Sequence, residues 1–176
     1  MEQRLFTEPQ DITIKYKAEQ FKKIENILGK HFDMVEFTFF LALIGYKNRQ
    51  CIPLDSIDGD TEHTFSRVTY NKSSVEYDAY FGLFTILTNQ DKSYDEIINH
   101  MAFLKTSHTN YKYTQLPSVQ TYYGYVLGGI QPLYDICNRY DMKDSIELFD
   151  SLYEYLDELV DITSFVNGNS SEAQNA

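Results

Sequence analysis

The sequence predicts a mainly α-helical fold, a single-domain bundle of about six helices with at most one or two short strands. In most of the chain, apolar side chains recur at intervals of three and four residues, the spacing that gathers them on one helix face. Helix-start signals precede two of these segments. Hydrophobic residues make up 43% and aromatic residues 15% of the 176 residues, enough to fill one core. We therefore expect one domain over residues 1–166 and a disordered tail over residues 167–176.

The N-terminal part of the chain predicts one extended segment and two helices. Residues 11–16 alternate weakly between polar and apolar side chains, as a short strand does. Residues 18–30 carry apolar side chains at helical spacing, with a glycine near their end to stop the helix. Residues 34–44 follow a capping-box pair, Asp33 and Glu36, and are apolar on nearly every side, which predicts a central buried helix.

The middle of the chain predicts a loop, a short strand and two further helices. We expect Gly45 to end the buried helix and residues 45–54 to form a loop that returns to the core. Residues 63–70 are rich in β-branched and aromatic side chains and favour a strand. Residues 75–88 and 93–105 predict helices, and the second of these opens with a capping box.

A polar segment, residues 106–117, predicts a linker before a long helix over residues 118–140. Gly124 and Gly128 stand four residues apart in this helix, so a neighbouring backbone can approach closely. Tight packing is the expected reason for these glycines. Pro132 should kink or divide the helix, because proline cannot donate the helical hydrogen bond.

The strongest single feature is an acidic amphipathic helix predicted from Lys143 to Thr163. Its acidic side chains recur mostly at steps of three or four and gather on one face: Asp144, Glu147, Asp150, Glu154, Asp157, Glu158 and Asp161. Like charges at this spacing destabilise a helix by roughly a few tenths of a kcal/mol per pair. The face therefore has two interpretations, a solvated surface, or a contact site that meets a basic protein surface or mimics DNA phosphates.

Composition limits the class of partner and the compartment. The 15 Lys and Arg against 26 Asp and Glu give a net charge of -11, which repels phosphate backbones and disfavours direct DNA binding. Cys51 and Cys137 fit neither a metal spacing nor a secreted disulfide framework, so we expect two reduced thiols. The sequence shows no signal-peptide pattern and no apolar run long enough for a membrane span. We expect a cytoplasmic protein with no membrane contact.

No catalytic constellation is recognisable, so we predict a protein that is not an enzyme and has no cofactor or metal. Four acidic residues surround Gly59, namely Asp55, Asp58, Asp60 and Glu62. Their spacing departs from that of a calcium-binding loop, and a solvated acidic turn is the better interpretation. The histidines never stand four apart, where two ring nitrogens would face one metal. The sequence also lacks a GxSxG nucleophile turn and a phosphate-binding glycine loop.

Two stretches resemble a known family. Residues 37–54, FTFFLALIGYKNRQCIPL, are similar to the alanine-rich helix, Leu-Gly-Tyr, basic pair and Pro-Leu segment of small Dnd-system-associated proteins. That family is encoded beside bacterial DNA phosphorothioation and restriction genes. Residues 122–130, YYGYVLGGI, resemble the family's Tyr-Ala-Asn-Gly-Gly helix. The resemblance spans residues 20–137, and the acidic helix after residue 141 has no counterpart in it.

The resemblance implies a small accessory subunit of a prokaryotic anti-phage defence complex, working beside an ATPase or nuclease and carrying no catalytic residues. We therefore predict a non-enzymatic adaptor that acts through protein-protein contacts. The predicted partner-binding residues follow the buried helix and line the acidic helix: Tyr46, Lys47, Arg49, Asp150, Glu154, Asp157 and Glu158. The alternative is a phage-type inhibitor or DNA mimic whose acidic helix blocks a nucleic-acid-binding protein. A small enzyme with an unrecognised site is a third hypothesis.

Overall fold

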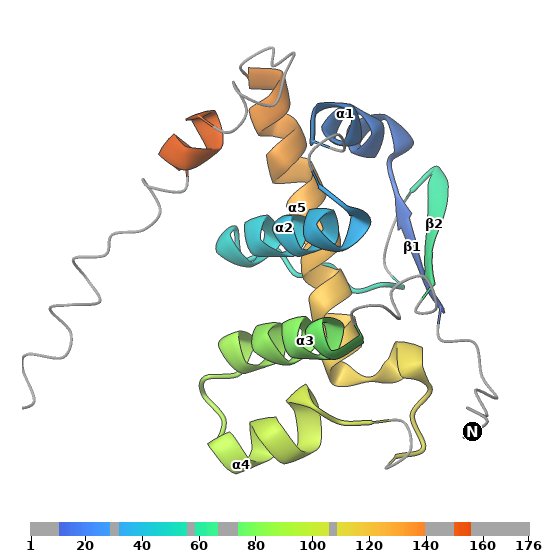
Figure 1. Cartoon of the computed structure of the whole chain (residues 1–176), viewed down its shortest axis with the longest axis vertical. Coiled ribbons are helices and arrows are strands. Elements are labelled where there is room, and N and C mark those ends of the chain that lie inside the picture. The colour runs from blue at the N-terminus through green and yellow to red at the C-terminus, as the bar shows by residue number, and fades with distance from the viewer. Residues whose placement is uncertain are drawn as a thin grey trace, which may run out of the picture.

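The computed structural model describes residues 11–28, 32–55, 59–66, 74–105, 109–139 and 150–155. These residues form a mainly helical fold with one two-stranded sheet, which confirms the predicted fold class (Figure 1). The elements in chain order are β1 (Asp11–Tyr16), α1 (Ala18–Leu28), α2 (Met34–Lys47), β2 (Thr61–Ser66), α3 (Ser74–Thr88), α4 (Tyr94–Ile97), the π-helical turn η2 (Ile98–Ala102), the 3-10 turn η4 (Tyr113–Gln115) and α5 (Pro117–Arg139). Residues 150–155 are also helical. The predicted tail and the rest of the predicted acidic helix lie outside the described residues.

The sheet pairs β1 with β2 in antiparallel register, with Ile12 opposite Phe65. Alternation along β1 sends Ile12 and Ile14 into the core, while Lys15 points outward and pairs with Glu62 at 3.3 Å. The predicted extended segment of residues 11–16 is therefore confirmed. The second strand begins at Thr61, two residues before its predicted start.

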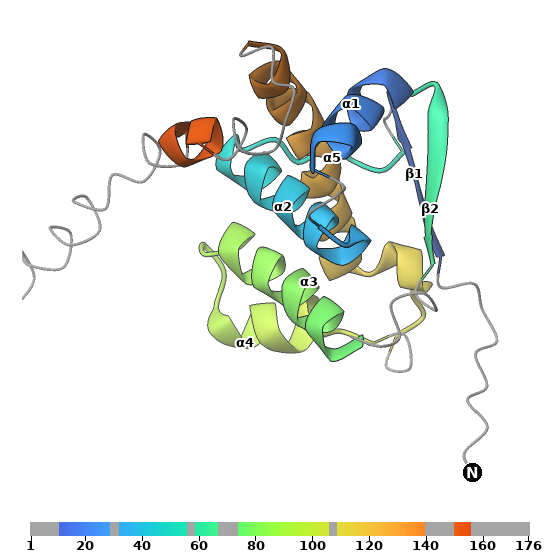
Figure 2. The same cartoon turned by 45° about the horizontal axis from the view of Figure 1, so that its top comes forward.

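The long helix α5 is the axis of the fold, and α1, α2 and α3 all pack against it (Figure 1 and Figure 2). Of the two outcomes predicted at Pro132, a kink or a division of the helix, the division does not occur, because α5 runs on to Arg139. Ile130 and Leu133 are buried on either side of the proline. Packing of these side chains in the core stabilises the helix enough to offset the hydrogen bond that proline cannot make.

The helix α2 crosses α5 at a contact between glycines. A Cβ atom at Gly45 would lie 2.1 Å from the carbonyl oxygen of Tyr125 and 2.9 Å from the backbone nitrogen of Gly129. The prediction that Gly45 ends the buried helix is wrong, since α2 continues to Lys47. Gly45 is needed for close approach of two backbones, whereas the sequence pattern was that of a helix stop.

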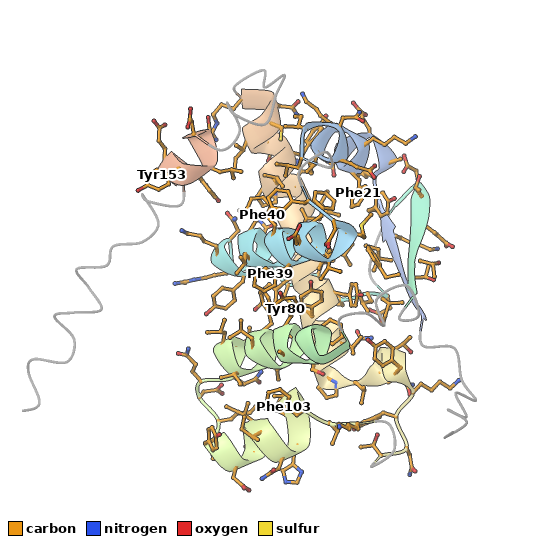
Figure 3. All side chains as sticks on the ribbon, viewed as in Figure 1. Phe21, Phe39, Phe40, Tyr80, Phe103 and Tyr153 are labelled. Atoms are coloured by element: carbon orange, nitrogen blue, oxygen red, sulfur yellow. The ribbon has the colours of Figure 1, made fainter. Side chains whose placement is uncertain are left out.

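Aromatic side chains fill the space between α2, α3 and α5 (Figure 3). The rings of Phe81 and Phe84 on α3 contact that of Tyr122 on α5, with centroids 4.7 and 5.5 Å apart. The buried Tyr122 hydroxyl donates to Oγ1 of Thr38 at 3.2 Å, and that hydroxyl donates to the carbonyl oxygen of Val35. The buried hydroxyls of Tyr122 and Thr38 therefore each have a partner, as burial of polar groups requires.

Two segments differ in detail from their predictions. The helix predicted over residues 93–105 begins as expected, with the Ser93 hydroxyl accepting the N–H of Glu96 at 3.2 Å, but it turns π-helical at Ile98 and ends at Ala102. The predicted polar linker over residues 106–117 contains a 3-10 turn whose Tyr113 is buried in the core. A tyrosine in a polar stretch thus anchors the chain instead of facing solvent.

One hydrophobic cluster extends from Ile12 in β1 to Leu152 in the last helical segment and includes side chains of α1, α2, α3 and α5. Within the described ranges, no helix is both long and apolar enough to cross a membrane.

Candidate partner-binding surface

The candidate surface begins where α2 ends. Asn48 caps the helix, and the backbone N–H of Arg49 donates to the carbonyl oxygen of Tyr46 at 2.9 Å. The N–H of Gln50 donates to the carbonyl oxygen of Gly45, also at 2.9 Å. These two bonds form a Schellman motif, which requires one residue in the left-handed conformation just after the cap. Here that residue is Arg49, with φ of 55°.

An arginine in this conformation is unusual. Glycine is the common residue there, because the side chain of any L-amino acid adds a strain of about 1–2 kcal/mol in the left-handed region. Among the described residues, Arg49 is the one non-glycine residue with a positive φ. Its side chain is exposed and forms no ion pair with another described residue.

The backbone that follows Arg49 is held against α5. The N–H of Ile52 donates to the carbonyl oxygen of Gly124 at 3.0 Å. The carbonyl oxygen of Gln50 lies so close to α5 that a Cβ atom at Gly128 would be 1.7 Å from it. Because α2 precedes Arg49 and these contacts follow it, Arg49 projects from a fixed backbone.

Tyr46 and Lys47, which were predicted to bind the partner together with Arg49, are less exposed than Arg49. Tyr46 is half-buried, and its ring meets those of Phe84 and Tyr125 edge-on, with centroids 6.1 and 5.6 Å away. Its ring joins three helices, so packing accounts for its position. Lys47 is half-buried at the helix end, and partial burial lowers the pKa of its ammonium.

The helical segment of residues 150–155 lies beside the C-terminal end of α2 (Figure 1 and Figure 2). The hydroxyl of Tyr155 donates to Oδ1 of Asn48 at 2.7 Å, and Leu152 is only 2% exposed. Asp150 and Glu154, one turn apart, are exposed. The structure therefore brings the basic and the acidic residues predicted to bind a partner onto neighbouring segments.

Part of the predicted acidic face cannot be placed. Asp157 and Glu158 lie outside the described residues. Tyr153, in the same helical turn as Asp150 and Glu154 (Figure 3), is 73% exposed. The described turn thus presents an aromatic ring together with the carboxylates of Asp150 and Glu154.

Sequence reasoning missed an apolar member of this surface, Leu43. It is 37% exposed and stands one turn before Lys47, so the two side chains share the outer face of α2. Leu83 on the adjacent α3 is similarly open, at 40%. No sequence signal marks these residues, because both helices are apolar on nearly every side and an outward leucine looks like an inward one.

The acidic turn near Gly59 has a structural use. Oδ1 of Asp60 accepts the backbone N–H of Ala18 at 2.8 Å, at the first residue of α1. This hydrogen bond holds the pKa of the Asp60 carboxyl below its usual value. Asp58 lies outside the described residues. In the part of the chain that the structure describes, no three His, Cys, Asp or Glu side chains are grouped to hold a metal ion.

The two cysteines differ in access. Cys51 is exposed, although burial of its sulfur raises the pKa of the thiol. Cys137 is fully buried, and burial raises its pKa to about 11. Neither forms a disulfide.

The two stretches that carry the family resemblance meet in the structure. Residues 37–54 comprise most of α2 and the loop after it, and residues 122–130 lie within α5. Their glycines form the helix crossing, because a Cβ atom at Gly129 would be 2.0 Å from the carbonyl oxygen of Leu41. Residues of both stretches therefore set how the two helices pack. Comparisons with protein families, with curated proteins and with solved structures found no match to this chain.

Proposed function

We propose that this chain is a non-enzymatic adaptor subunit that binds a protein partner, an ATPase or nuclease of a prokaryotic anti-phage defence complex. The contact surface is formed by Leu43, Lys47 and Arg49 at the end of α2 together with Asp150 and Glu154. The protein contributes binding and positioning, and the partner contributes the chemistry.

One observation carries the proposal, the hydrogen bond from Tyr155 to Asn48. It connects the end of α2 to a segment more than one hundred residues later in the chain. It holds side by side two segments that carry an open leucine, basic side chains and two exposed carboxylates. Protein interfaces combine an apolar centre with a polar rim in this way, and arginine is enriched in them.

The kind of partner follows from charge and from the resemblance. A net charge of -11 favours a protein partner over a phosphate backbone. The resemblance of residues 37–54 and 122–130 to Dnd-system-associated proteins supports a place in a defence complex.

Co-expression tests the proposal. The affinity-tagged chain is expressed with the product of each gene that neighbours its own, and each mixture is purified and run on size exclusion with light scattering. We expect one neighbour to elute with the chain as a stoichiometric complex that survives 150 mM salt. Elution of the chain alone from every co-expression would contradict the adaptor function.

Exposure of Asp150 and Glu154 one turn apart favours a second candidate function, a DNA mimic that occupies the nucleic-acid channel of a nuclease. Neutralising the four acidic residues Asp150, Glu154, Asp157 and Glu158 to Asn or Gln tests the mimic. A mimic loses its binding to the nuclease while the far-UV circular dichroism spectrum stays unchanged. Retained binding rules the mimic out.

A further inference from the structure

We infer, building on the proposed function, that Arg49 is the residue that determines partner recognition and that it binds a carboxylate on the partner's surface. The inference comes from the position of this arginine in the fold. Its neighbours Tyr46 and Lys47 are half-buried, whereas Arg49 is exposed on a fixed backbone.

The strained backbone is the first argument. With glycine at position 49, the same two Schellman hydrogen bonds, from residue 49 to Tyr46 and from Gln50 to Gly45, would form without strain. The described part of the fold gains no ion pair from the guanidinium. A non-glycine residue in this region of conformational space is typical of sites where the side chain has a use of its own.

Rigidity is the second argument. Arg49 stands between the end of α2 and a loop held to α5 by the bond from Ile52 to Gly124. A partner group that meets this guanidinium does not have to order the backbone first, so less of the contact energy is lost on binding. The planar guanidinium offers two parallel N–H donors, which match the two oxygens of a carboxylate.

The surroundings favour a protein carboxylate over a nucleic-acid phosphate. The carboxylates of Asp150 and Glu154 are on the neighbouring segment, which Tyr155 joins to Asn48. A run of phosphates that approached Arg49 would also approach these carboxylates and be repelled. A single carboxylate of the partner would pair with Arg49. Basic side chains of the partner on either side of that carboxylate would pair with Asp150 and Glu154.

Three substitutions at one position test the inference on the purified complex. Arg49→Gly removes the side chain and the strain, Arg49→Asn removes the charge but tolerates the left-handed conformation, and Arg49→Lys keeps the charge without the two-pronged donor. Lys22→Gln on α1 is the matched control, since it removes one exposed positive charge from a different element. Partner affinity is measured by titration calorimetry and melting temperature by circular dichroism.

We expect Arg49→Gly and Arg49→Asn to weaken partner binding by about tenfold to a hundredfold, the loss for one charge-assisted pair. Arg49→Lys should fall between these and the wild type, and Lys22→Gln should bind as the wild type does. The melting temperature of Arg49→Gly should not fall, which separates lost recognition from lost folding.

Other outcomes overturn the inference in distinguishable ways. Wild-type affinity in Arg49→Gly shows that the arginine is dispensable, while the adaptor function stands because the partner still binds. Absence of any complex with the wild-type chain removes the adaptor function as well. The third outcome concerns a 20-base-pair DNA duplex, with binding measured by fluorescence anisotropy. If the wild type binds this duplex more tightly than Arg49→Gly does, and the protein complex is unaffected, then Arg49 binds a phosphate and not a carboxylate.

Discussion

Replacing Gly129 by alanine tests whether the crossing of α2 and α5 depends on backbone contact. The new Cβ atom would lie 2.0 Å from the carbonyl oxygen of Leu41, 2.8 Å from its carbonyl carbon and 3.1 Å from the nitrogen of Gly45. All three are backbone atoms of α2, and ordinary contact begins at 3.4 Å. The two helices must therefore separate by about 1.4 Å at this point.

The magnitude follows from two opposing effects. Alanine favours the helix over glycine by about 1 kcal/mol. Overpacking of a core costs about 1–3 kcal/mol where side chains can move aside; here a whole helix must move, and we expect a cost of roughly 3–5 kcal/mol. We expect Gly129→Ala to lower the free energy of unfolding by roughly 2–4 kcal/mol, which is a fall of roughly 4–16 °C in melting temperature for a chain of this length.

The matched control is Gly82→Ala on α3. There the new Cβ atom meets the ring of Phe103, at 2.3 Å from Cε1. That ring is 47% exposed and can rotate away, so the gain in helix propensity offsets the contact (Figure 3). Gly82→Ala should stay within about 1 kcal/mol of the wild type.

Urea unfolding followed by circular dichroism measures both variants. Equal stability of Gly129→Ala and Gly82→Ala would refute the backbone-contact explanation. The pair Gly45→Ala and Gly129→Ala adds a second check, because one separation of the helices accommodates both methyl groups. The double variant should lose less stability than the sum of the single losses.

Three further predictions concern the cap, the acidic turn and the thiols. Asp33→Ala should lower the free energy of unfolding by about 1 kcal/mol in urea titrations, because Oδ1 of Asp33 accepts two backbone N–H groups at the start of α2. The folded-state pKa of Asp60 is lowered, so its contribution to stability is complete above the ordinary value of 3.8 and is lost as pH falls below it. In urea titrations at a series of pH values, Asp60→Asn should therefore reduce the fall in stability below pH 3.8. At pH 8 a thiol reagent should label Cys51 in the native protein and reach Cys137 only in denaturant, and equal labelling rates would contradict the burial of Cys137.

Sequence patterns over a few residues predicted where helices begin, but they did not predict which residues of distant segments pack together. The pair Asp33 and Glu36 is a capping box in the structure, with both hydrogen bonds present, because a cap depends on residues three apart. Gly45 carries the signal of a helix stop, yet its role depends on Gly129, more than eighty residues later. No local pattern holds that information. Tyr113 was likewise assigned to a polar linker, because its burial depends on distant elements.

The same limit applies to the candidate surface. The sequence picked out Arg49 as a basic residue after the buried helix, but the positive φ that sets it apart depends on how α2 ends. The proximity of Asn48 and Tyr155 depends on tertiary packing and has no sequence pattern. Leu43 could not be separated from its buried neighbours, since hydrophobicity alone does not tell which face of an apolar helix meets solvent.

The position of α5 late in the chain also affects how the protein is made. Thr38 on α2 and Tyr122 on α5, which are hydrogen-bonded in the folded protein, are separated by 84 residues. Ribosomes add roughly 5–20 residues per second, so α2 leaves the ribosome roughly 4–17 s before the helix that covers it. During that time α2, which is apolar on nearly every side, lacks its main packing partner in the folded protein, and its uncovered apolar side chains are a binding site for chaperones.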